Sequence, residues 1–546
     1  MRLGVSLYAD LAARLRRSRS TLPLLTVGLV AITAYLPALW AGFVADDFTM
    51  LRTVGGVADP FSSFGRNDLG EGGGAGHFYR PLWVLWNAAI VWVFGERAVA
   101  FHALNLLLFA VVAMEVWLLA RRFLPWPRAL IAALFFALYP RHGESVAWVS
   151  GNTDLLATAL AMGSLLTLLA PDVRRRLSLA AALTVAAALV KESAFVLPVL
   201  AFLVLRLGRH AGTSHARELR WRGPVVMVAA LLPVLLVRAL VLGGVGGYTE
   251  EPVTPRRVLA SAASYLLATV TPPQLEVLRF PVLLTVPAAL TALAAWALWQ
   301  LRASRDAERL RSVALGLAWF AVSLLPVLGQ PLDVNNSTGE RLRFLPSVGL
   351  AVALGALLPT PRGARRKVVL ATAATVAALS CLFSASSWVT AGDIAERIAD
   401  EAAQLAPSGG QLIVLSLPES YRNAHVFTNS FDVAVSRAGR SDALVSWCIP
   451  VHVRHERGEQ IHFRREATVY VGTTTWAVPF DYPVVGEPGA LTPGCAYARR
   501  VGAEGTPGLE LEGIARPAPS RARVRLAFFD GRSLRSVGEV AGPSPQ

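Results

Sequence analysis

Long apolar stretches separated by arginine-rich loops set the pattern of this 546-residue sequence. An α-helix needs about 20 mainly apolar residues to cross the hydrocarbon core of a membrane. Six segments clearly reach this length, and three shorter apolar runs accompany them: 22–42, 99–120, 223–242, 280–301, 311–328 and 367–388, with 128–140, 154–170 and 343–358. The pattern predicts an α-helical polytopic membrane protein.

One further apolar segment, 177–206, is interrupted in its middle by Lys191 and Glu192. A single straight helix would place this charged pair at the centre of the bilayer, where charge is costly. It would also join two arginine-rich flanks on opposite sides of the membrane, against the positive-inside rule. We therefore expect a helical hairpin with the pair at its tip, which brings the total to eleven spans.

The charge distribution gives the orientation. The chain carries a net charge of +15, but only 16% of its residues are charged and 54% are hydrophobic, which excludes a nucleic-acid binder and a disordered chain. The N-terminal tail and every second loop together hold 24 Lys or Arg and five acids, a net charge of +19. The rest of the chain has a net charge of −4, so these basic loops and the N-terminus are expected in the cytoplasm.

Three regions follow from this topology. We expect a basic cytoplasmic tail at 1–21, a membrane domain at 22–389 with a large first external loop at 43–98, and an external soluble domain at 390–546. Within the loop, the Trp-rich run 81–95 fits an interfacial helix, with a buried bundle helix as the alternative. In the last region, a helix-like opening and short strand-like runs predict a small α/β or β-rich domain.

The external region contains two cysteines, Cys448 and Cys495. Only two of 52 basic residues are lysine, which indicates a GC-rich bacterial genome and hence a bacterial inner membrane with an external, periplasmic C-terminal domain. Because the external side of such a membrane is oxidising, these cysteines are predicted to form a disulfide. Two free buried thiols are the alternative.

Five polar clusters lie in or beside the apolar segments. They contain Asp46 and Asp47; Tyr79 and Arg80; His142, Glu144, Asn152 and Asp154; Lys191 and Glu192; and Glu340, Arg341 and Arg343. Ionisable groups next to membrane spans are functional candidates by default, and all five clusters fall on the external side. Carboxylates beside several cations suit transfer from a phosphate-linked substrate, because a carboxylate removes a proton or binds a metal while cations neutralise the departing phosphate.

At these positions the sequence resembles a known family. The ordered motifs FVADD (43–47), YRPL (79–82), FHALN (101–105), FALYPRHGESVAWVSGNTDLL (136–156), KE (191–192) and ERLRFLPSVGL (340–350) resemble the membrane half of the transmembrane and tetratricopeptide-repeat containing protein O-mannosyltransferases. These belong to the GT-C class of polyprenyl-phosphate-sugar-dependent glycosyltransferases. The resemblance covers about residues 20–390 and implies a GT-C fold that uses a polyprenyl-phosphate-linked sugar donor and contacts membrane lipid.

The resemblance also implies roles for individual residues. Asp46 and Asp47 match the family's acidic pair, one as general base towards the acceptor hydroxyl and the other orienting it or helping to bind a divalent metal. Arg80, Lys191 and Arg341 are our candidates for contact with the donor phosphate. The remaining substrate-site positions that match family motifs are His142, Glu144, Glu192 and Glu340, with Pro346 and Ser347 beside them.

The sequence also departs from the family. The family pattern usually has His in place of Tyr139, Arg in place of Asn152 and a Tyr-rich stretch at 342–344, and the tetratricopeptide repeats are missing. The sugar and the acceptor, whether protein, lipid or glycan, therefore stay open. A lipid or glycan transporter and a non-catalytic anchor for the external domain are the alternative functions.

Overall fold

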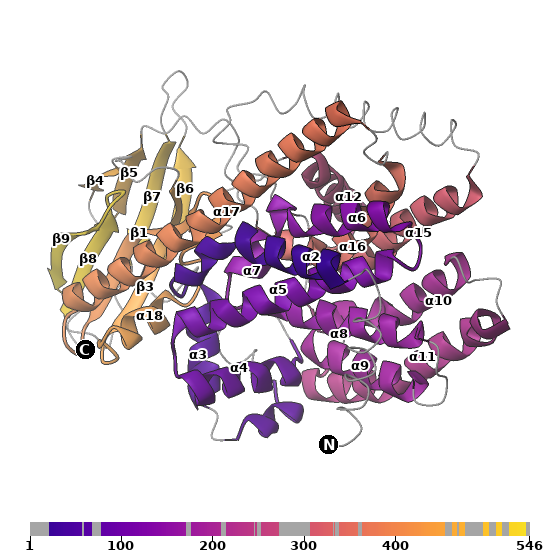
Figure 1. Cartoon of the computed structure of the whole chain (residues 1–546). Helices are drawn as coiled ribbons and strands as arrows, with labels where there is room; N and C mark the ends of the chain where they lie inside the picture. Colours follow the sequence, from indigo (N-terminus) through magenta and orange to yellow (C-terminus); the bar gives the residue numbers. More distant parts are fainter. Residues whose placement is uncertain are drawn as a thin grey trace. The chain divides into compact units, whose positions relative to one another are not determined.

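We describe a computed structural model of the chain (Figure 1). The structure describes residues 21–56, 59–67, 78–170, 176–208, 214–244, 246–247, 253–271, 306–330, 332, 338–358, 363–453, 461–466, 469–474, 495–501, 509–515 and 523–541. The chain divides into two compact units, and each is treated by itself below. The first contains 1–40 and 54–386, and the second contains 41–53 and 387–546.

The first unit is helical. Four of the described helices are long and apolar enough to cross a membrane: α5 (Ala98–Ala120), residues 219–242 of α11 (Ser214–Leu242), α15 (Ala307–Leu324) with its 3₁₀ extension, and α17 (Ala364–Leu405), whose later part belongs to the second unit. They match four of the six long apolar segments of the sequence. A fifth, 280–301, lies outside the described residues.

The sixth long segment, 22–42, is not one helix. It forms α2 (Thr21–Ala34) followed by the 3₁₀ turn η1 (Leu36–Trp40). Pro37 explains the break, because a proline disfavours the α conformation in the residue before it and offers no backbone N–H for a helical hydrogen bond. The shorter helices of this unit are α4 (Pro81–Phe94), α6 (Trp126–Ala137), α7 (Gly143–Ala147), α8 (Asn152–Leu168), α9 (Arg176–Val190), α10 (Leu197–Leu207), α12 (Pro255–Val270) and α16 (Phe344–Leu357).

The segment 177–206 is broken at its charged pair, as the sequence predicts. Helix α9 ends at Val190, Lys191 has extended backbone angles (φ −156°, ψ 139°), and the 3₁₀ turn η4 (Glu192–Val196) leads into α10. The Lys191 N–H closes the ladder of α9 by donating to the Ala187 carbonyl oxygen at 2.9 Å, and its own carbonyl oxygen accepts from the Ala194 N–H of η4 at 3.2 Å. The charged pair is thereby placed at the junction of two helices and not within one.

Helices α15 and α16 approach each other at a pair of glycines. A Cβ atom on Gly316 would lie 2.5 Å from the Gly349 carbonyl oxygen, and one on Gly349 would lie 2.5 Å from that of Gly316. Only glycine permits this separation. Close backbone contact through small residues is typical of helix packing in membranes, where no hydrophobic effect drives helices together.

Helix α4 has one buried and one exposed tryptophan at its two ends. Trp83 is buried, whereas Trp92 is 87% exposed within the chain. An amphipathic tryptophan exposed at one end of a short apolar helix suits the membrane interface. The first half of the helix is thus packed in the unit, and an interfacial position for its last turn stays a prediction.

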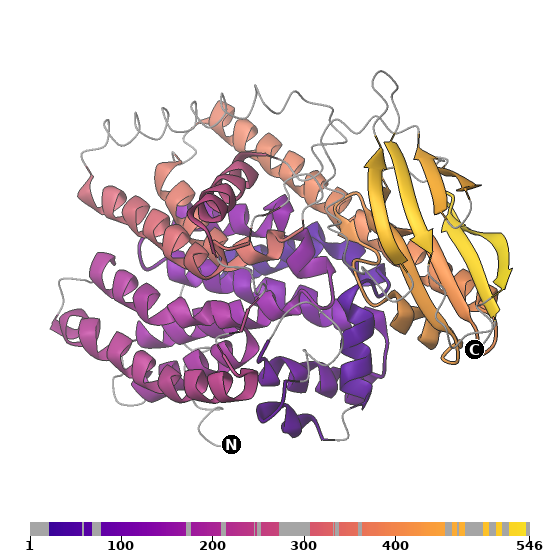
Figure 2. The same ribbon diagram turned by 180° about the vertical axis from the view of Figure 1, so that it is seen from behind.

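The second unit contains two sheets, drawn in orange and yellow in Figure 2. The first has strand order β2-β1-β8-β9, with β3 also paired to β1: β1 (Gln411–Tyr421), β2 (Ala424–His425), β3 (Leu444–Val453), β8 (Arg523–Phe529) and β9 (Leu534–Ala541). The second has order β4-β5-β7-β6: β4 (Ile461–Glu466), β5 (Val469–Thr474), β6 (Cys495–Val501) and β7 (Leu509–Ala515).

Strand β1 is parallel to both β3 and β8, with Gln411 opposite Leu444 on one side and Val524 on the other. Parallel neighbours need crossover connections, and α18 (Phe431–Arg437) lies in the chain between β1 and β3. The unit is therefore a mixed α/β structure. The side chains of Cys448 and Cys495 lie outside the described residues, so their disulfide stays a prediction.

Candidate functional site

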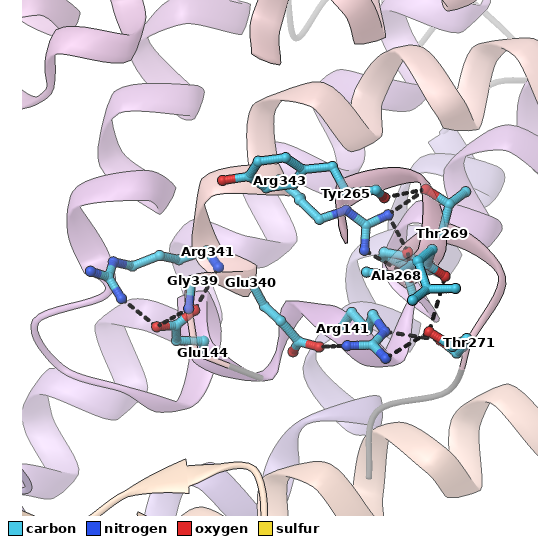
Figure 3. A network of polar contacts seen from close by, with 12 residues as sticks. Arg141, Glu144, Tyr265, Ala268, Thr269, Thr271, Gly339, Glu340, Arg341 and Arg343 are labelled. Atoms are coloured by element: carbon cyan, nitrogen blue, oxygen red, sulfur yellow. Dashed lines mark hydrogen bonds and ion pairs between the residues drawn. The ribbon is translucent and has the colours of Figure 1, made fainter. Parts of the chain in front are cut away.

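A buried ion pair joins Arg141 to Glu340, two residues almost 200 positions apart in the chain (Figure 3). Arg141 lies in the 3₁₀ turn η3 (Pro140–His142), and Glu340 begins the 3₁₀ turn η6 (Glu340–Arg343). Both side chains are at most 1% exposed. Charges this far from water are costly unless they are paired, so each residue depends on the other.

Arg141 also holds the end of helix α12. Its Nε donates to the Thr271 carbonyl oxygen at 2.9 Å, and its Nη2 donates to Thr271 Oγ1 at 3.0 Å. A second guanidinium reaches the same helix end, because Arg343 Nη1 donates to the Ala268 carbonyl oxygen at 2.9 Å. The last carbonyls of a helix carry partial negative charge, and two cations there satisfy them.

Arg343 bridges two further elements. Its Nη2 donates to the Tyr139 hydroxyl at 2.7 Å and to Thr269 Oγ1 at 2.9 Å, and its guanidinium lies 5.4 Å from the Tyr139 ring centre. Tyr139 and Arg343 are both departures from the family pattern, and here they contact each other. A sequence alone offers no signal for this pairing, since 204 positions separate them.

Glu144 binds the backbone that precedes and begins η6. Its carboxylate accepts from the Gly339 N–H at 3.3 Å and from the Arg341 N–H at 2.7 Å, and it forms an ion pair with the Arg341 guanidinium (Figure 3). Gly339 has φ +89°, a left-handed conformation that glycine adopts without strain. The Arg341 guanidinium also lies 4.8 Å from the centre of the Trp148 ring. Glu144 therefore positions Arg341 through both backbone and side chain.

His142 is enclosed by aromatic rings. Its ring centre lies 4.6 Å from that of Phe136, 4.8 Å from that of Phe344 and 5.2 Å from that of Tyr139. Its Nε2 shares a hydrogen bond of 2.9 Å with Ser347 Oγ. Burial and, to a smaller extent, the positive charge of Arg343 lower the pKa of His142 to about 3, so the imidazole is neutral at physiological pH.

Two more ion pairs lie where α9 is broken. Lys191 Nζ donates to Asp154 Oδ2 at 2.5 Å, with both side chains buried. Arg80 binds Glu192 with two parallel hydrogen bonds, Nη2 to Oε1 at 2.6 Å and Nε to Oε2 at 3.1 Å. Burial raises the pKa of Glu192, but the charge and hydrogen bonds of Arg80, together with the charge of Lys191 and a backbone hydrogen bond, outweigh it and lower this pKa to about 2.

Three cations share Asp154 as a common neighbour. Lys191 interacts electrostatically with this carboxylate most strongly, and Arg341 and Arg80 do so as well. The positive charges of the three candidate phosphate-binding residues therefore all act on one buried carboxylate of α8, which Lys191 contacts directly. The sequence placed Asp154 in a polar cluster but gave it no role, because a single carboxylate at the start of a helix carries little signal.

Asn152, the other departure in this region, joins a hydrogen-bonded chain with α4. Trp83 Nε1 donates to Asn152 Oδ1, and Asn152 Nδ2 donates to Asn87 Oδ1 at 3.0 Å. Asn87 Nδ2 in turn donates to the Trp83 carbonyl oxygen at 2.8 Å. These bonds fix the helix that follows Arg80, and so fix the start of the segment that carries that cation.

The acidic pair belongs to the second unit. Asp46 and Asp47 begin α3 (Asp46–Gly56), and Asp47 is fully buried with its Oδ2 accepting from the Val44 N–H at 3.1 Å. Asp46 is half-buried and accepts from Asn429 Nδ2. Four of the five predicted clusters therefore lie in the first unit, and the cluster of Asp46 and Asp47 lies in the second.

Within the part of the chain that the structure describes, no group of three or more His, Cys, Asp or Glu side chains is arranged to hold a metal ion. The resemblance makes one of Asp46 and Asp47 the general base and the other a residue that orients the acceptor or helps to bind a divalent metal. Their observed contacts are with an amide side chain and a backbone N–H.

The sequence is similar to protein O-mannosyl-transferases. It is 30% identical over 338 residues to Tmtc2 of Drosophila melanogaster, which covers 58% of this chain and 35% of that protein. It is 36% identical over 134 residues to Tmtc1 of the same organism, a match that covers 23% of this chain and 16% of that protein. It is 30% identical over 150 residues to mouse TMTC3, a match that covers 26% of this chain and 16% of that protein. These matches confirm the resemblance drawn from the motifs. The chain spans about a third or less of each relative's length.

No protein-family model matches the chain. Among solved structures, the ArnT crystal structure from Cupriavidus metallidurans bound to undecaprenyl phosphate has a TM-score of 0.39 and 13% identity, covering 79% of this chain and 90% of that one. The Archaeoglobus fulgidus oligosaccharyltransferase has a TM-score of 0.40 and 12% identity, with 78% and 62% covered. Scores this low do not bear on function.

Proposed function

We propose that this protein is a membrane glycosyltransferase of the GT-C type, which transfers a sugar from a polyprenyl-phosphate donor to an acceptor hydroxyl on the external face. It would lie in a bacterial inner membrane with eleven spans, a cytoplasmic N-terminus and residues 390–546 outside. The similarity to protein O-mannosyl-transferases supports the reaction class. The four long apolar helices support the membrane location.

The observation that carries the proposal is a set of three cations, each paired with a carboxylate. Arg80, Lys191 and Arg341 come from three separate motifs, and all three interact with the Asp154 carboxylate. Each is held by a paired carboxylate, from Glu192, Asp154 and Glu144 respectively. Oriented cations in a site of low dielectric stabilise the charge that develops on a departing phosphate.

The reaction balances with these groups. A carboxylate of the acidic pair takes the proton from the acceptor hydroxyl, and the hydroxyl oxygen forms a bond to the anomeric carbon of the sugar. The bond from that carbon to the phosphate oxygen breaks at the same time, and polyprenyl phosphate leaves with the electron pair. Attack opposite to the leaving group inverts the anomeric centre. The acceptor then carries the sugar, and the base later returns its proton to water.

The other site residues hold these groups in place. Glu144 and Glu192 orient Arg341 and Arg80 through their ion pairs. Glu340 compensates Arg141, which holds the end of α12, and the neutral His142 fixes the start of α16 through Ser347. Effective catalysis needs this kind of support, because an error of about 1 Å in a reacting group can cost about 100-fold in rate.

Separate Asp46→Asn and Asp47→Asn variants test the proposed base. With purified protein in lipid nanodiscs and polyprenyl-phosphate-mannose as the first donor, at least one variant should lose about 10²- to 10⁴-fold in transfer rate. Asp400→Asn is the matched control, since Asp400 is exposed on α17 in the same unit. Full activity of both Asp46→Asn and Asp47→Asn would refute the proposed base.

One observation favours a lipid or glycan transporter as the second candidate. The helix break at Lys191, with its buried charges, is a feature that transporters use to form binding sites. A transporter would move a labelled polyprenyl-phosphate sugar across a vesicle membrane without cleaving it. Detection of free polyprenyl phosphate as the product would exclude this candidate.

A further inference from the structure

The segment that carries the acidic pair packs against one segment of the C-terminal region. Residues 45–52 contact residues 426–432, which follow β2 and run into the start of α18. The Ala45 N–H donates to the Val426 carbonyl oxygen at 2.8 Å, and the Phe48 and Phe427 rings stack with centres 6.2 Å apart. Both segments belong to the second unit, although about 380 positions separate them.

Strained backbone marks this contact on both sides. Ala45 has φ +45° and Ser430 has φ +62°, left-handed conformations that are unfavourable for a non-glycine residue. Such strain persists only where surrounding contacts over-determine the conformation, and it often accompanies functional sites. Ala45 directly precedes Asp46, and Ser430 directly follows Asn429. The strained residues thus adjoin Asp46 and Asn429, whose side chains are hydrogen-bonded to each other.

A chain of side-chain hydrogen bonds holds the Asp46 carboxylate. Asn429 Nδ2 donates to Asp46 Oδ1, and Ser430 Oγ donates to Asn429 Oδ1 at 3.1 Å. Ser430 Oγ also lies 2.5 Å from Thr49 Oγ1, one helical turn beyond Asp46. Because its Oδ1 is occupied by Ser430, the Asn429 amide presents its N–H group to Asp46. The orientation of the amide is therefore set by Ser430 and Thr49.

We propose that Asn429 is a positioning residue for the Asp46 carboxylate, so that the C-terminal region supplies part of the machinery for transfer. The inference rests on the proposed function, in which the acidic pair contains the base. A neutral amide suits this task, since it orients a carboxylate by a hydrogen bond without the full charge neutralisation that a lysine or arginine would cause. Asp47 instead bonds to the backbone of its own turn.

Asn429→Ala tests the role of the amide. Loss of the donor should lower kcat for sugar transfer by at least 10-fold, while KM for the lipid donor stays within twofold and the melting temperature changes little. Thr428→Val is the matched control, because Thr428 lies in the same segment and its hydroxyl shares a hydrogen bond of 3.1 Å with His425 Nδ1, away from Asp46 and Asn429 in the chain of hydrogen bonds. It should retain the wild-type kcat.

Asn429→Asp tests the pH dependence of kcat, which should stay unchanged if Asn429 has a purely structural role. Two facing carboxylates resist simultaneous ionisation, so the acidic limb of the kcat profile should move upward by about one pH unit or more. The other titratable groups of the two packed segments are Asp47, Arg52, His425 and Asp432, and they are unchanged in this variant. Asn429→Ala should lower kcat without this displacement.

The outcomes separate the two proposals. Wild-type kcat in Asn429→Ala, or an unmoved acidic limb in Asn429→Asp, would overturn the inference while Asp46→Asn and Asp47→Asn still decide the base. Equal losses of kcat and melting temperature in Asn429→Ala and Thr428→Val would also overturn it, since the segment would then be merely structural. Full activity in both aspartate variants would instead overturn the proposed base.

Discussion

The acidic pair of the second unit is held in a different way from the site carboxylates of the first. In the first unit, carboxylates meet guanidinium or ammonium groups, as in Arg141–Glu340 and Lys191–Asp154. In the second, Asp46 meets a neutral amide and Asp47 meets a backbone N–H. A paired charge holds structure and is costly to break, whereas a carboxylate oriented by a neutral donor can still accept a proton from a substrate. We therefore expect substitutions in the first set to lower stability in addition to any effect on phosphate binding, and those of the acidic pair to affect mainly the rate.

Breaking the most buried pair should have the largest effect on stability. Glu340→Met would leave the Arg141 guanidinium buried without its carboxylate, which costs about 3–5 kcal/mol. Thermal unfolding of the purified protein in detergent measures this loss. The double variant Arg141→Met/Glu340→Met should recover part of it, though the Thr271 carbonyl would lose its donor. Glu308→Met is the control, since Glu308 is exposed. Equal melting temperatures of Glu340→Met and Glu308→Met would contradict the buried Arg141–Glu340 ion pair.

A milder change at the Arg80–Glu192 pair should have a smaller effect. Arg80→Lys keeps the charge but loses the two parallel hydrogen bonds, and we expect a loss of about 1–2 kcal/mol. Arg97→Lys is the control, since Arg97 is exposed at the start of α5. Equal stability of the two variants would show that the bidentate geometry contributes nothing. If Arg80 also contacts the donor phosphate, Arg80→Lys should raise KM for the donor.

The same pair predicts a pH dependence. The pKa of Glu192 is lowered from 4.5 to about 2, so its contribution to stability is complete above about pH 4.5 and is lost as the pH falls through about 2. The difference in unfolding free energy between wild type and Glu192→Gln should therefore shrink across this window. A constant difference from about pH 5 to pH 2 would refute the pairing in solution.

The smallest effect is expected at the hydroxyl pair of the second unit. Thr49→Val removes the hydrogen bond to Ser430 but keeps the side-chain shape, which should cost about 1 kcal/mol of stability. Because Ser430 orients the Asn429 amide, kcat should also fall by a few-fold. A stability loss with no change in kcat would separate the hydroxyl pair from the positioning of Asp46.

Much of the helical unit follows from sequence patterns that act locally. Apolar length predicted α5, α11, α15 and the first part of α17, and the charges at Lys191 and Glu192 predicted the break between α9 and α10. These elements depend on hydrophobicity and the cost of buried charge, which a linear pattern records. The eleven-span count and the orientation remain predictions.

The partners of the charged residues were much harder to predict. Arg141 with Glu340, Arg343 with Tyr139, and Asp46 with Asn429 join positions about 200 to 380 residues apart. Each contact depends on how helices or segments pack, and no spacing in the sequence encodes that. Asn429 in particular sits in a polar stretch between a strand and a helix, where an asparagine carries no signal of its own.

The most direct test of the proposed function is the release of polyprenyl phosphate by the purified wild-type protein in nanodiscs. The donors offered are polyprenyl phosphates linked to mannose, glucose or N-acetylglucosamine, and the matching nucleotide sugars, each with cell-envelope extract as acceptor. The proposal predicts that at least one lipid-linked donor yields free polyprenyl phosphate and a sugar on the acceptor, with every nucleotide sugar left intact. Consumption of a nucleotide sugar, or intact lipid-linked donors throughout, would contradict it.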